Sequence, residues 1–142
     1  MKKIILSVVA IICIATLACT NASAVGTYSL SQGGIELCYK KIQNMTAALS
    51  ISSAGNAKCV SEVYVQYGYN VRATVDLKKK EGTSWTTVKT WVHSGSGYVG
   101  VNTSDSYKVS RGTYIVQLTA YVTDSNGNHI ETQYCTSQWA TY

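Results

Sequence analysis

The fold is decided by the stretch VRATVDLKK at residues 71–79. Its apolar residues Val71, Ala73, Val75 and Leu77 alternate with polar ones. Successive side chains of a β-strand point to opposite faces of the sheet, so this stretch has one apolar and one polar face. Antiparallel strands with one face on a core and the other in water have this pattern. The stretch therefore predicts a strand that covers one side of a hydrophobic core.

Further strands are predicted on both sides of this stretch. The same alternation marks residues 57–66 and 113–123, and an Asn-Gly pair at 126–127 is a strong hairpin signal. No convincing helix follows residue 24. About seven strands separated by turns rich in Gly, Asn and Ser predict an all-β, immunoglobulin-like antiparallel β-sandwich, with a small barrel as the alternative. The expected strands are 45–52, 57–66, 71–79, 84–93, a broken strand at 98–103 and 107–109, 113–123, and 129–142.

The first 24 residues have the organisation of a secretory signal peptide. Lys2 and Lys3 form a basic start, residues 4–17 are almost unbroken apolar sequence, and the triplet ASA at 22–24 matches an A-x-A cleavage site. The apolar run of about 14 residues is shorter than the ~20 residues that a transmembrane helix needs. No second such run follows, so no transmembrane span is expected in the mature chain.

These features predict the domain organisation and the address of the protein. We expect a helical signal peptide over 1–24, an N-terminal arm with a first short strand over 25–41, and the sandwich domain over 42–142. The protein is predicted to be secreted, extracellular or associated with the cell envelope. In the alternative, Cys19 would be lipidated as in a lipoprotein, although Thr16 departs from the apolar residue expected there.

Composition and motif content argue against several function classes. The chain has 12 Lys+Arg against 7 Asp+Glu without a basic stripe, so no nucleic-acid partner is expected. At 46% hydrophobic and 13% charged residues it is too apolar for a disordered tail. Neither His93 nor His129 lies in a nucleophile–base pattern, the carboxylates are scattered, and no metal-ligand spacing or phosphate loop is present. We predict a protein that is not an enzyme and has no catalytic residue, metal or cofactor.

Three cysteines remain after the predicted cleavage, at Cys38, Cys59 and Cys135. Export permits a disulfide bridge. Cys59 shares its face with Val63, so we expect it to point into the core. Cys135 is opposite in phase to Ile130 and is expected to face outward unless a bulge intervenes. Cys38 is also out of phase with its apolar neighbours. We therefore predict a Cys38–Cys135 bridge with Cys59 as a buried thiol, and Cys59–Cys135 is the alternative.

The most distinctive segment is WTTVKTW, which begins at Trp85 and ends at Trp91. Strand alternation would place Trp85, Lys89 and Trp91 on one face and Val88 and Val92 on the other. If the valines face the core, the two tryptophans are exposed and suited to stacking on sugar rings or to a membrane interface. Lys89 between them would make a cation–π contact. In the alternative, one tryptophan closes the end of the sandwich.

A second aromatic cluster consists of Tyr64, Tyr67 and Tyr69 in a predicted loop. Tyrosines in loops supply rigid, amphipathic contact area, as they do in antibody paratopes. In the alternative they serve as ordinary packing rings, because the chain has 11 Tyr and no Phe. The run Lys78-Lys79-Lys80 is interpreted as a solvated hairpin end or as a contact for an anionic polymer.

Five segments spread over residues 42–142 share a pattern with one group of proteins: LSIS at 49–52, G-x-A-K-C at 55–59, LKK at 77–79, SWTTVKTW at 84–91 and GTY at 112–114. They resemble small exported β-rich proteins of Gram-positive gut bacteria that are classed as domains of unknown function. The resemblance implies export and an immunoglobulin-like sandwich, and it implies no activity. In that group an arginine often follows the GTY tyrosine, where this chain has Ile115. The GTY start also suits a tyrosine corner.

The combined prediction is a secreted, non-enzymatic binding module for a glycan, a wall polymer or a host surface. Its expected ligand-binding residues are Trp85, Lys89, Trp91, Tyr64, Tyr67 and Tyr69. The alternative is a secreted membrane-active toxin or bacteriocin-like protein, because amphipathic strands rich in Ser, Thr, Tyr and Trp could form a membrane-inserting hairpin.

Overall fold

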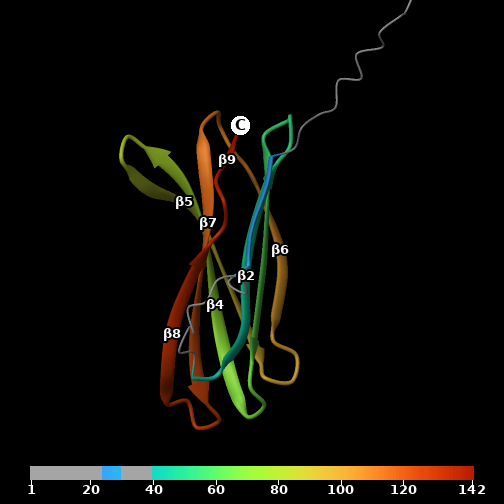
Figure 1. The fold of residues 1–142 in the computed structure, drawn as a ribbon, viewed down its shortest axis with the longest axis vertical. Coiled ribbons are helices and arrows are strands. Elements are labelled where there is room, and N and C mark those ends of the chain that lie inside the picture. The colour runs from blue at the N-terminus through green and yellow to red at the C-terminus, as the bar shows by residue number, and fades with distance from the viewer. Residues whose placement is uncertain (1–23, 30–39) are drawn as a thin grey trace, which may run out of the picture.

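Two antiparallel β-sheets pack face to face in the computed structural model, which describes residues 24–29 and 40–142 (Figure 1). The first sheet has the strand order β1-β2-β3-β6, and the second has the order β5-β4-β7-β8, with β9 pairing β7. This confirms the predicted antiparallel sandwich. The strands are β1 (Ala24–Ser29), β2 (Ile42–Ile51), β3 (Asn56–Val65), β4 (Tyr69–Glu81), β5 (Ser84–Ser96), β6 (Val101–Lys108), β7 (Thr113–Asp124), β8 (His129–Thr136) and β9 (Ala140–Thr141).

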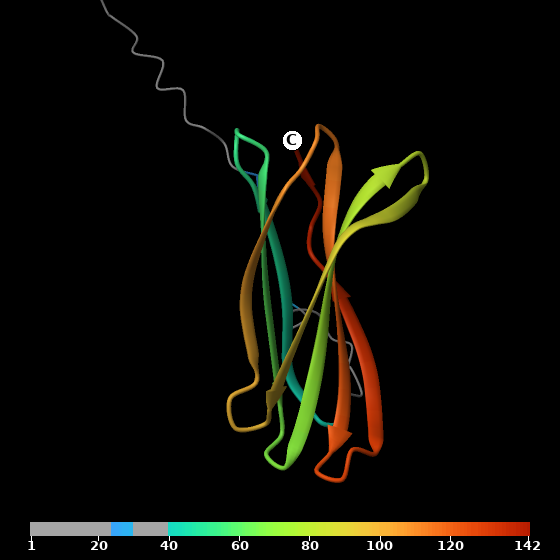
Figure 2. The same cartoon turned by 180° about the vertical axis from the view of Figure 1, so that it is seen from behind.

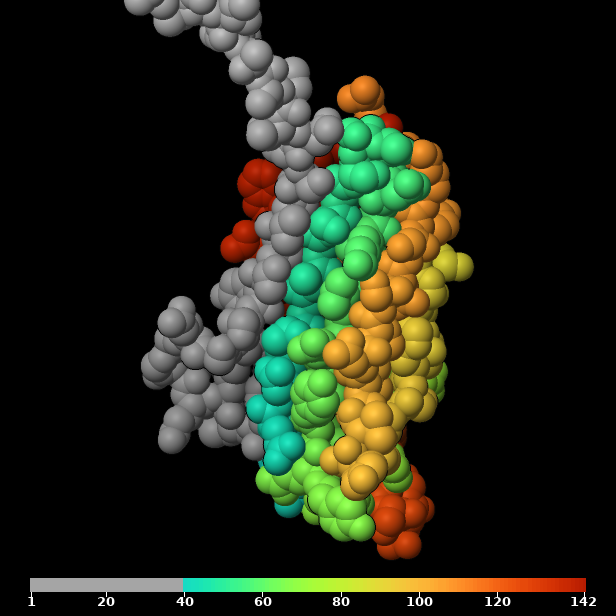
Figure 3. Space-filling view, turned by 90° about the vertical axis from the view of Figure 1, so that its right-hand side faces the viewer, coloured from blue at the N-terminus to red at the C-terminus, as the bar shows by residue number. Residues whose placement is uncertain are grey.

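The N-terminal arm contributes to the first sheet where it is described. Strand β1 pairs with β2 along its whole length, from Ala24↔Ile51 to Ser29↔Thr46. Figure 3 looks onto the outer face of this sheet, where β2, β3 and β6 lie side by side. The predicted signal peptide lies almost entirely outside the described residues. Residues 24–29 and 40–142 include no helix that is long and apolar enough to cross a membrane.

The stretch at 71–79 forms most of β4, which lies between β5 and β7 in the second sheet. Its alternation is confirmed, because Val71, Ala73, Val75 and Leu77 are all at most 2% exposed. They pack with the inner faces of β2, β3 and β7 in one core. Burial of each valine or leucine contributes about 1.5–3 kcal/mol, so this strand stabilises the core by several such increments.

Tyr114 anchors the beginning of β7. Its ring is buried at 1% exposure, and its hydroxyl donates to the backbone carbonyl of Ser110 at 2.8 Å. A buried tyrosine that bonds back to the chain a few residues upstream is the defining contact of a tyrosine corner. The feature predicted from GTY at 112–114 is therefore present.

The Asn-Gly pair at 126–127 forms the turn between β7 and β8, as predicted. Gly127 has a φ of +86°, a conformation that glycine adopts at little cost. One oxygen of Asp124 accepts the backbone N–H groups of Asn126 and Asn128, each at 2.9 Å. The side chain of Asn128 and these N–H groups lower the pKa of Asp124, because they favour the ionised carboxylate. The acid at this turn is thus already satisfied by its own loop.

A β-bulge interrupts the pairing of β4 and β5. Leu77 pairs with Lys89, whereas the next residue, Lys78, pairs with Thr87. Val88 is therefore an extra residue on β5 without a partner on β4. The extra residue shifts the in-and-out alternation of β5 by one. Two odd-numbered residues, one before Val88 and one after it, therefore point to opposite faces of the sheet.

The bulge separates the two tryptophans of β5. Trp91 pairs with the buried Val75, lies on the inner face and packs against the core, while Val92 is exposed. Trp85 lies beyond the bulge and faces outward beside Lys80. The prediction that Trp85, Lys89 and Trp91 share one exposed face is therefore wrong. Two rings at a spacing of six residues share a face only in an uninterrupted strand.

Strand β8 turns a carboxylate inward. Glu131 is 7% exposed and accepts hydrogen bonds from the backbone N–H groups of Lys40, Lys41 and Ile42, with N···O distances of 3.1, 2.6 and 3.1 Å. These three residues lead into β2, so the carboxylate joins the second sheet to the first. Bonds to an ionised acceptor are strong, and three of them offset the desolvation of the charge.

Cys135 shares the inner face of β8 with Glu131 and is 4% exposed. The prediction that it faces outward is wrong, because a β-bulge leaves Ile130 without a partner on β7, and the phase counted from Ile130 does not hold beyond it. Cys59 is fully buried, as predicted. Both are free thiols, so the alternative bridge Cys59–Cys135 is not formed, and the described residues contain no disulfide. Cys38 lies outside the described residues, but Cys135 is a free thiol, so the predicted Cys38–Cys135 bridge is wrong as well.

Candidate functional site

A cleft between two tryptophans lies at the end of the sandwich that carries the β4–β5 hairpin. The hairpin bends away from the body of the molecule (Figure 2), and Lys80 and Trp85 pair across it. Trp139, between β8 and β9, and Thr113, at the start of β7, complete the lining of a cavity of about 260 Å³. We call these four residues the tryptophan cleft.

Trp139 is a cleft residue that the sequence did not predict. It is 68% exposed, while Trp85 is 38% exposed. Its neighbour Ala140 is buried and pairs with Tyr114 at the edge of the core, which turns Trp139 outward. The alternation of the last strand could have indicated its exposure, but nothing in the sequence places it beside Trp85, more than fifty residues earlier.

Of the three consecutive lysines at 78–80, only the last is directed to this cleft. Lys78 Nζ donates to Gln117 Oε1, and Lys79 Nζ donates to Ser110 Oγ at 2.9 Å. Lys80 is exposed and makes no side-chain hydrogen bond within the part of the chain that the structure describes. The cleft therefore combines two indole rings, one available ammonium group and one hydroxyl. This set suits a polar ring with apolar faces, because such a ring can stack on indoles and bond at its rim.

Lys89 and Trp91 lie at the seam between β5 and β6, the edge strands of the two sheets. Lys89 Nζ is 5.9 Å from the ring centre of Trp91 and 6.0 Å from that of Tyr107 on β6. The two rings meet edge to face, with centroids 6.5 Å apart. The predicted cation–π contact between Lys89 and Trp91 is present. It packs β5 against β6 at this edge and does not present Trp91 on an exposed face. Trp91 thus packs at the edge between the two sheets and not at the end of the sandwich, where the alternative placed one tryptophan.

A histidine and an aspartate complete this seam. His93 Nε2 lies 2.8 Å from Asp105 Oδ2, and Asp105 pairs with Cys59 across β3 and β6. Burial, reinforced by the negative charge of Asp105, raises the pKa of the Cys59 thiol to about 12. The thiol is therefore protonated and a poor nucleophile near neutral pH. No group of three or more potential metal ligands occurs in residues 24–29 and 40–142.

The buried thiols give a testable expectation. Desolvation also raises the pKa of Cys135 to about 12. Iodoacetamide at mildly alkaline pH should therefore leave Cys59 and Cys135 unmodified in the folded protein and alkylate both after unfolding in urea. Mass spectrometry of the two peptides measures this. Rapid alkylation of Cys59 in the folded protein would show that the core opens at β3 and contradict the burial of this thiol.

The opposite end of the sandwich carries exposed tyrosines on two turns. Tyr67, in the β3–β4 turn, is 84% exposed, and Tyr98, in the β5–β6 turn, is 85% exposed. Backbone packing holds these turns together, since the Gly97 N–H donates to the Tyr69 carbonyl at 2.8 Å. The turns and Ser125 surround a hollow of about 410 Å³. We call this region the tyrosine end.

The predicted trio of tyrosines is divided between three environments. Tyr67 lies at the tip, as a contact residue should. Tyr69 packs against the core, with Lys41 Nζ 4.9 Å from its ring centre. Tyr64 is 37% exposed on the outer side of β3, beside Gly100. Tyr98 joins Tyr67 at the tip and was not predicted, because only the turn-to-turn packing brings the two together.

Comparison with known proteins finds no match to this chain among protein-family models, curated proteins or solved structures.

Proposed function

We propose that this chain is an exported, non-enzymatic binding module that holds a saccharide unit of a glycan or wall polymer in the tryptophan cleft. The observation that carries the proposal is the convergence of two exposed indoles, Trp85 and Trp139, on one cavity. Indole faces are apolar while sugar hydroxyls stay in water at the ring edge, so stacking gains contact without burying unpaired polar groups.

The surroundings of the cleft support a binding role. Trp85 is on a two-stranded hairpin that reaches beyond the sheet, where a polymer has free access (Figure 2). Thr113 is held by pairing with Thr141 of β9, so one wall is part of the sheet. A site on paired strands stays close to its bound geometry, which lowers the entropy lost on binding.

The proposal predicts a specific loss of binding in Trp139→Ala. A glycan array first selects the saccharide that the wild-type protein binds. Removing one of two stacking indoles should lower the affinity for this saccharide about tenfold, which corresponds to about 1.4 kcal/mol. The same loss is expected for Trp85→Ala. Isothermal titration calorimetry with the selected glycan measures the change.

Tyr134→Ala is the matched control for this experiment. Tyr134 is 67% exposed on β8, almost the same as Trp139, but it does not line the cleft. Its replacement should leave the affinity unchanged. Equal losses in all three variants, or unchanged affinity in both tryptophan variants, would show that the ligand binds elsewhere.

A second candidate function is contact with a lipid bilayer. It is favoured by Tyr67, Tyr98 and Val99, which are all strongly exposed at the tyrosine end. Aromatic rings of this amphipathic kind also occur at membrane interfaces. A membrane-active protein would release dye from liposomes, and Tyr67→Ser/Tyr98→Ser would abolish the release. A binding module that acts through the tryptophan cleft should release none.

A further inference from the structure

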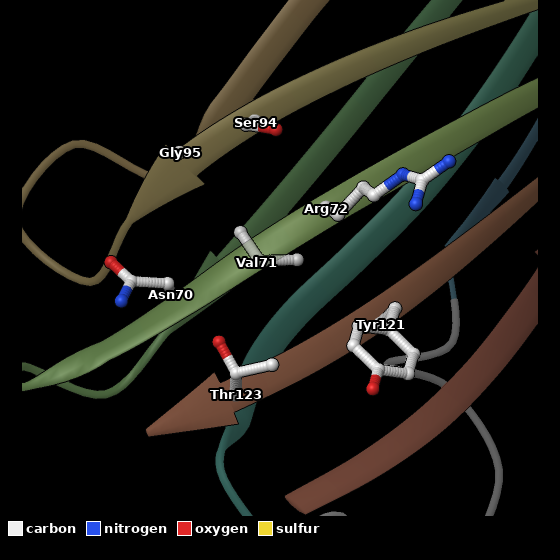
Figure 4. A pocket seen from close by; sticks show the side chains of 7 residues that line it. All are labelled: Asn70, Val71, Arg72, Ser94, Gly95, Tyr121 and Thr123. Carbon is white, nitrogen blue, oxygen red and sulfur yellow. The ribbon is translucent and has the colours of Figure 1, made fainter. Parts of the chain in front are cut away.

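The outer face of the second sheet carries a second hollow, far from the tryptophan cleft. It has a volume of about 510 Å³ (Figure 4). Arg72 of β4 and Tyr121 of β7 are directly paired across the sheet, and Ser94 of β5 pairs with Arg72 from the other side. The residues that line the hollow are Asn70, Val71, Arg72, Ser94, Gly95, Tyr121 and Thr123.

Arg72 is exposed and has no ion pair and no side-chain hydrogen bond within the part of the chain that the structure describes. Two other charged side chains of this face, which lie nearer to Arg72 than Lys80 does, are engaged in hydrogen bonds. The Asp76 carboxylate accepts from the Thr90 hydroxyl, and Lys78 donates to Gln117. The hollow therefore offers a guanidinium group whose donors are free for a ligand.

The remaining lining fits a sugar ring that carries a carboxylate. A guanidinium group binds a planar carboxylate through two parallel hydrogen bonds, a geometry that a lysine cannot reproduce. The Tyr121 ring stacks on His129, with centroids 4.7 Å apart, and this contact restrains it before any ligand arrives. Asn70 and the hydroxyls of Ser94 and Thr123 provide donors and acceptors around the ring.

We propose that the Arg72–Tyr121 hollow is a binding subsite for an acidic sugar, with Arg72 holding its carboxylate. Arg72 and Lys80 lie on the same outer face of β4, eight residues apart, which corresponds to about 26 Å along an extended strand. A chain of several sugar rings could reach from one to the other. The inference that one acidic polysaccharide spans both positions rests on the function proposed above, whereas the acidic-sugar subsite stands without it.

The subsite is tested with single sugars. Galacturonate should shift the NMR signals of the Arg72 Nε–H group and of the Ser94 and Tyr121 amides, and galactose should not. Arg72→Gln should lower the affinity for galacturonate at least tenfold. Arg72→Lys should retain only part of the wild-type affinity. Lys78→Gln, which removes the same charge from the same face outside the hollow, should change the affinity less than twofold.

Three results would overturn the subsite. The first is an equal loss in Arg72→Gln and Lys78→Gln, which would mean that only net charge matters. The second is inorganic phosphate binding as tightly as galacturonate, which would show a general anion site. The third is an absence of shifts with galacturonate in the folded wild-type protein. Circular dichroism of each variant confirms that it is folded, so a loss of binding cannot be due to unfolding.

The spanning ligand is tested with galacturonate oligomers of increasing length. Affinity should rise at least tenfold once an oligomer reaches from Arg72 to the tryptophan cleft, because the second contact becomes intramolecular. Trp139→Ala should remove this gain and leave monomer binding intact. No gain with length would overturn the spanning ligand alone. Trp139→Ala without effect on any glycan would overturn the proposed function and leave the acidic-sugar subsite standing.

Discussion

Glu131→Ala is expected to lower the free energy of unfolding by about 3–5 kcal/mol. The Glu131 carboxylate is the acceptor for three consecutive backbone N–H groups at Lys40–Ile42. Alanine leaves these donors without that acceptor, in a site where the side chain is 7% exposed. It also removes the contact between β8 and the start of β2. Urea titration with linear extrapolation measures the change.

Two further variants separate charge from shape at this position. Glu131→Gln keeps one carbonyl oxygen but places an NH₂ group against an N–H donor, so we expect a smaller loss of about 1–3 kcal/mol. Glu62→Ala is the control, since Glu62 on β3 accepts only an exposed bond from Asn102 at 3.1 Å. It should change the unfolding free energy by less than about 0.5 kcal/mol. A loss below about 1 kcal/mol in Glu131→Ala would contradict the structural role of this carboxylate.

Gly97→Ala is expected to destabilise the protein by about 2–3 kcal/mol. A Cβ atom at Gly97 would lie 2.0 Å from the Gln66 carbonyl oxygen and 2.9 Å from the Cα of Tyr67, both backbone atoms. The β5–β6 turn would have to move away from the β3–β4 turn. This movement would break the 2.8 Å hydrogen bond from the Gly97 N–H to the Tyr69 carbonyl. Thermal unfolding measures the loss.

Gly68→Ala is the comparison for this steric effect. Gly68 has a φ of +87°, and a Cβ atom added to it would meet no other atom within 4 Å. Alanine there would destabilise the protein only by the cost of a left-handed backbone conformation, about 1–2 kcal/mol.

The Gly97→Ala variant has a second readout. Hydrogen exchange should increase at the amide of residue 97 and at that of Val99. Equal melting temperatures for Gly97→Ala and the wild type would show that the two turns are not in close contact.

The core strands could be predicted because alternation along a strand is a local property. The period of two at 71–79 identified the inner face of β4 residue by residue, and the Asn-Gly pair marked the β7–β8 hairpin. In such an uninterrupted stretch, the burial of the apolar side chains follows from the sequence alone. The same rule applied across the bulge at Val88 placed Trp91 on the wrong face, because an inserted valine looks like any other strand residue.

The candidate binding surfaces could not be predicted because they depend on strand pairing. The approach of Trp139 to Trp85 requires β9 to pair with β7 and the β4–β5 hairpin to extend beside it. Burial of Glu131 runs against its polarity and depends on N–H donors some ninety residues earlier in the chain. From local sequence alone, only the exposure of individual rings such as Tyr67 could be predicted.

The strand order of the first sheet has a kinetic consequence. β3 pairs with β6 across the whole length of β4 and β5, and in the second sheet β4 pairs with β7 across β5 and β6. Neither pair can form by hairpin closure, so the chain must bring distant segments together before most of the core is buried. Domains dominated by such pairings refold in milliseconds to seconds. The chain contains no proline, so prolyl isomerisation adds no slower phase to this search for distant partners.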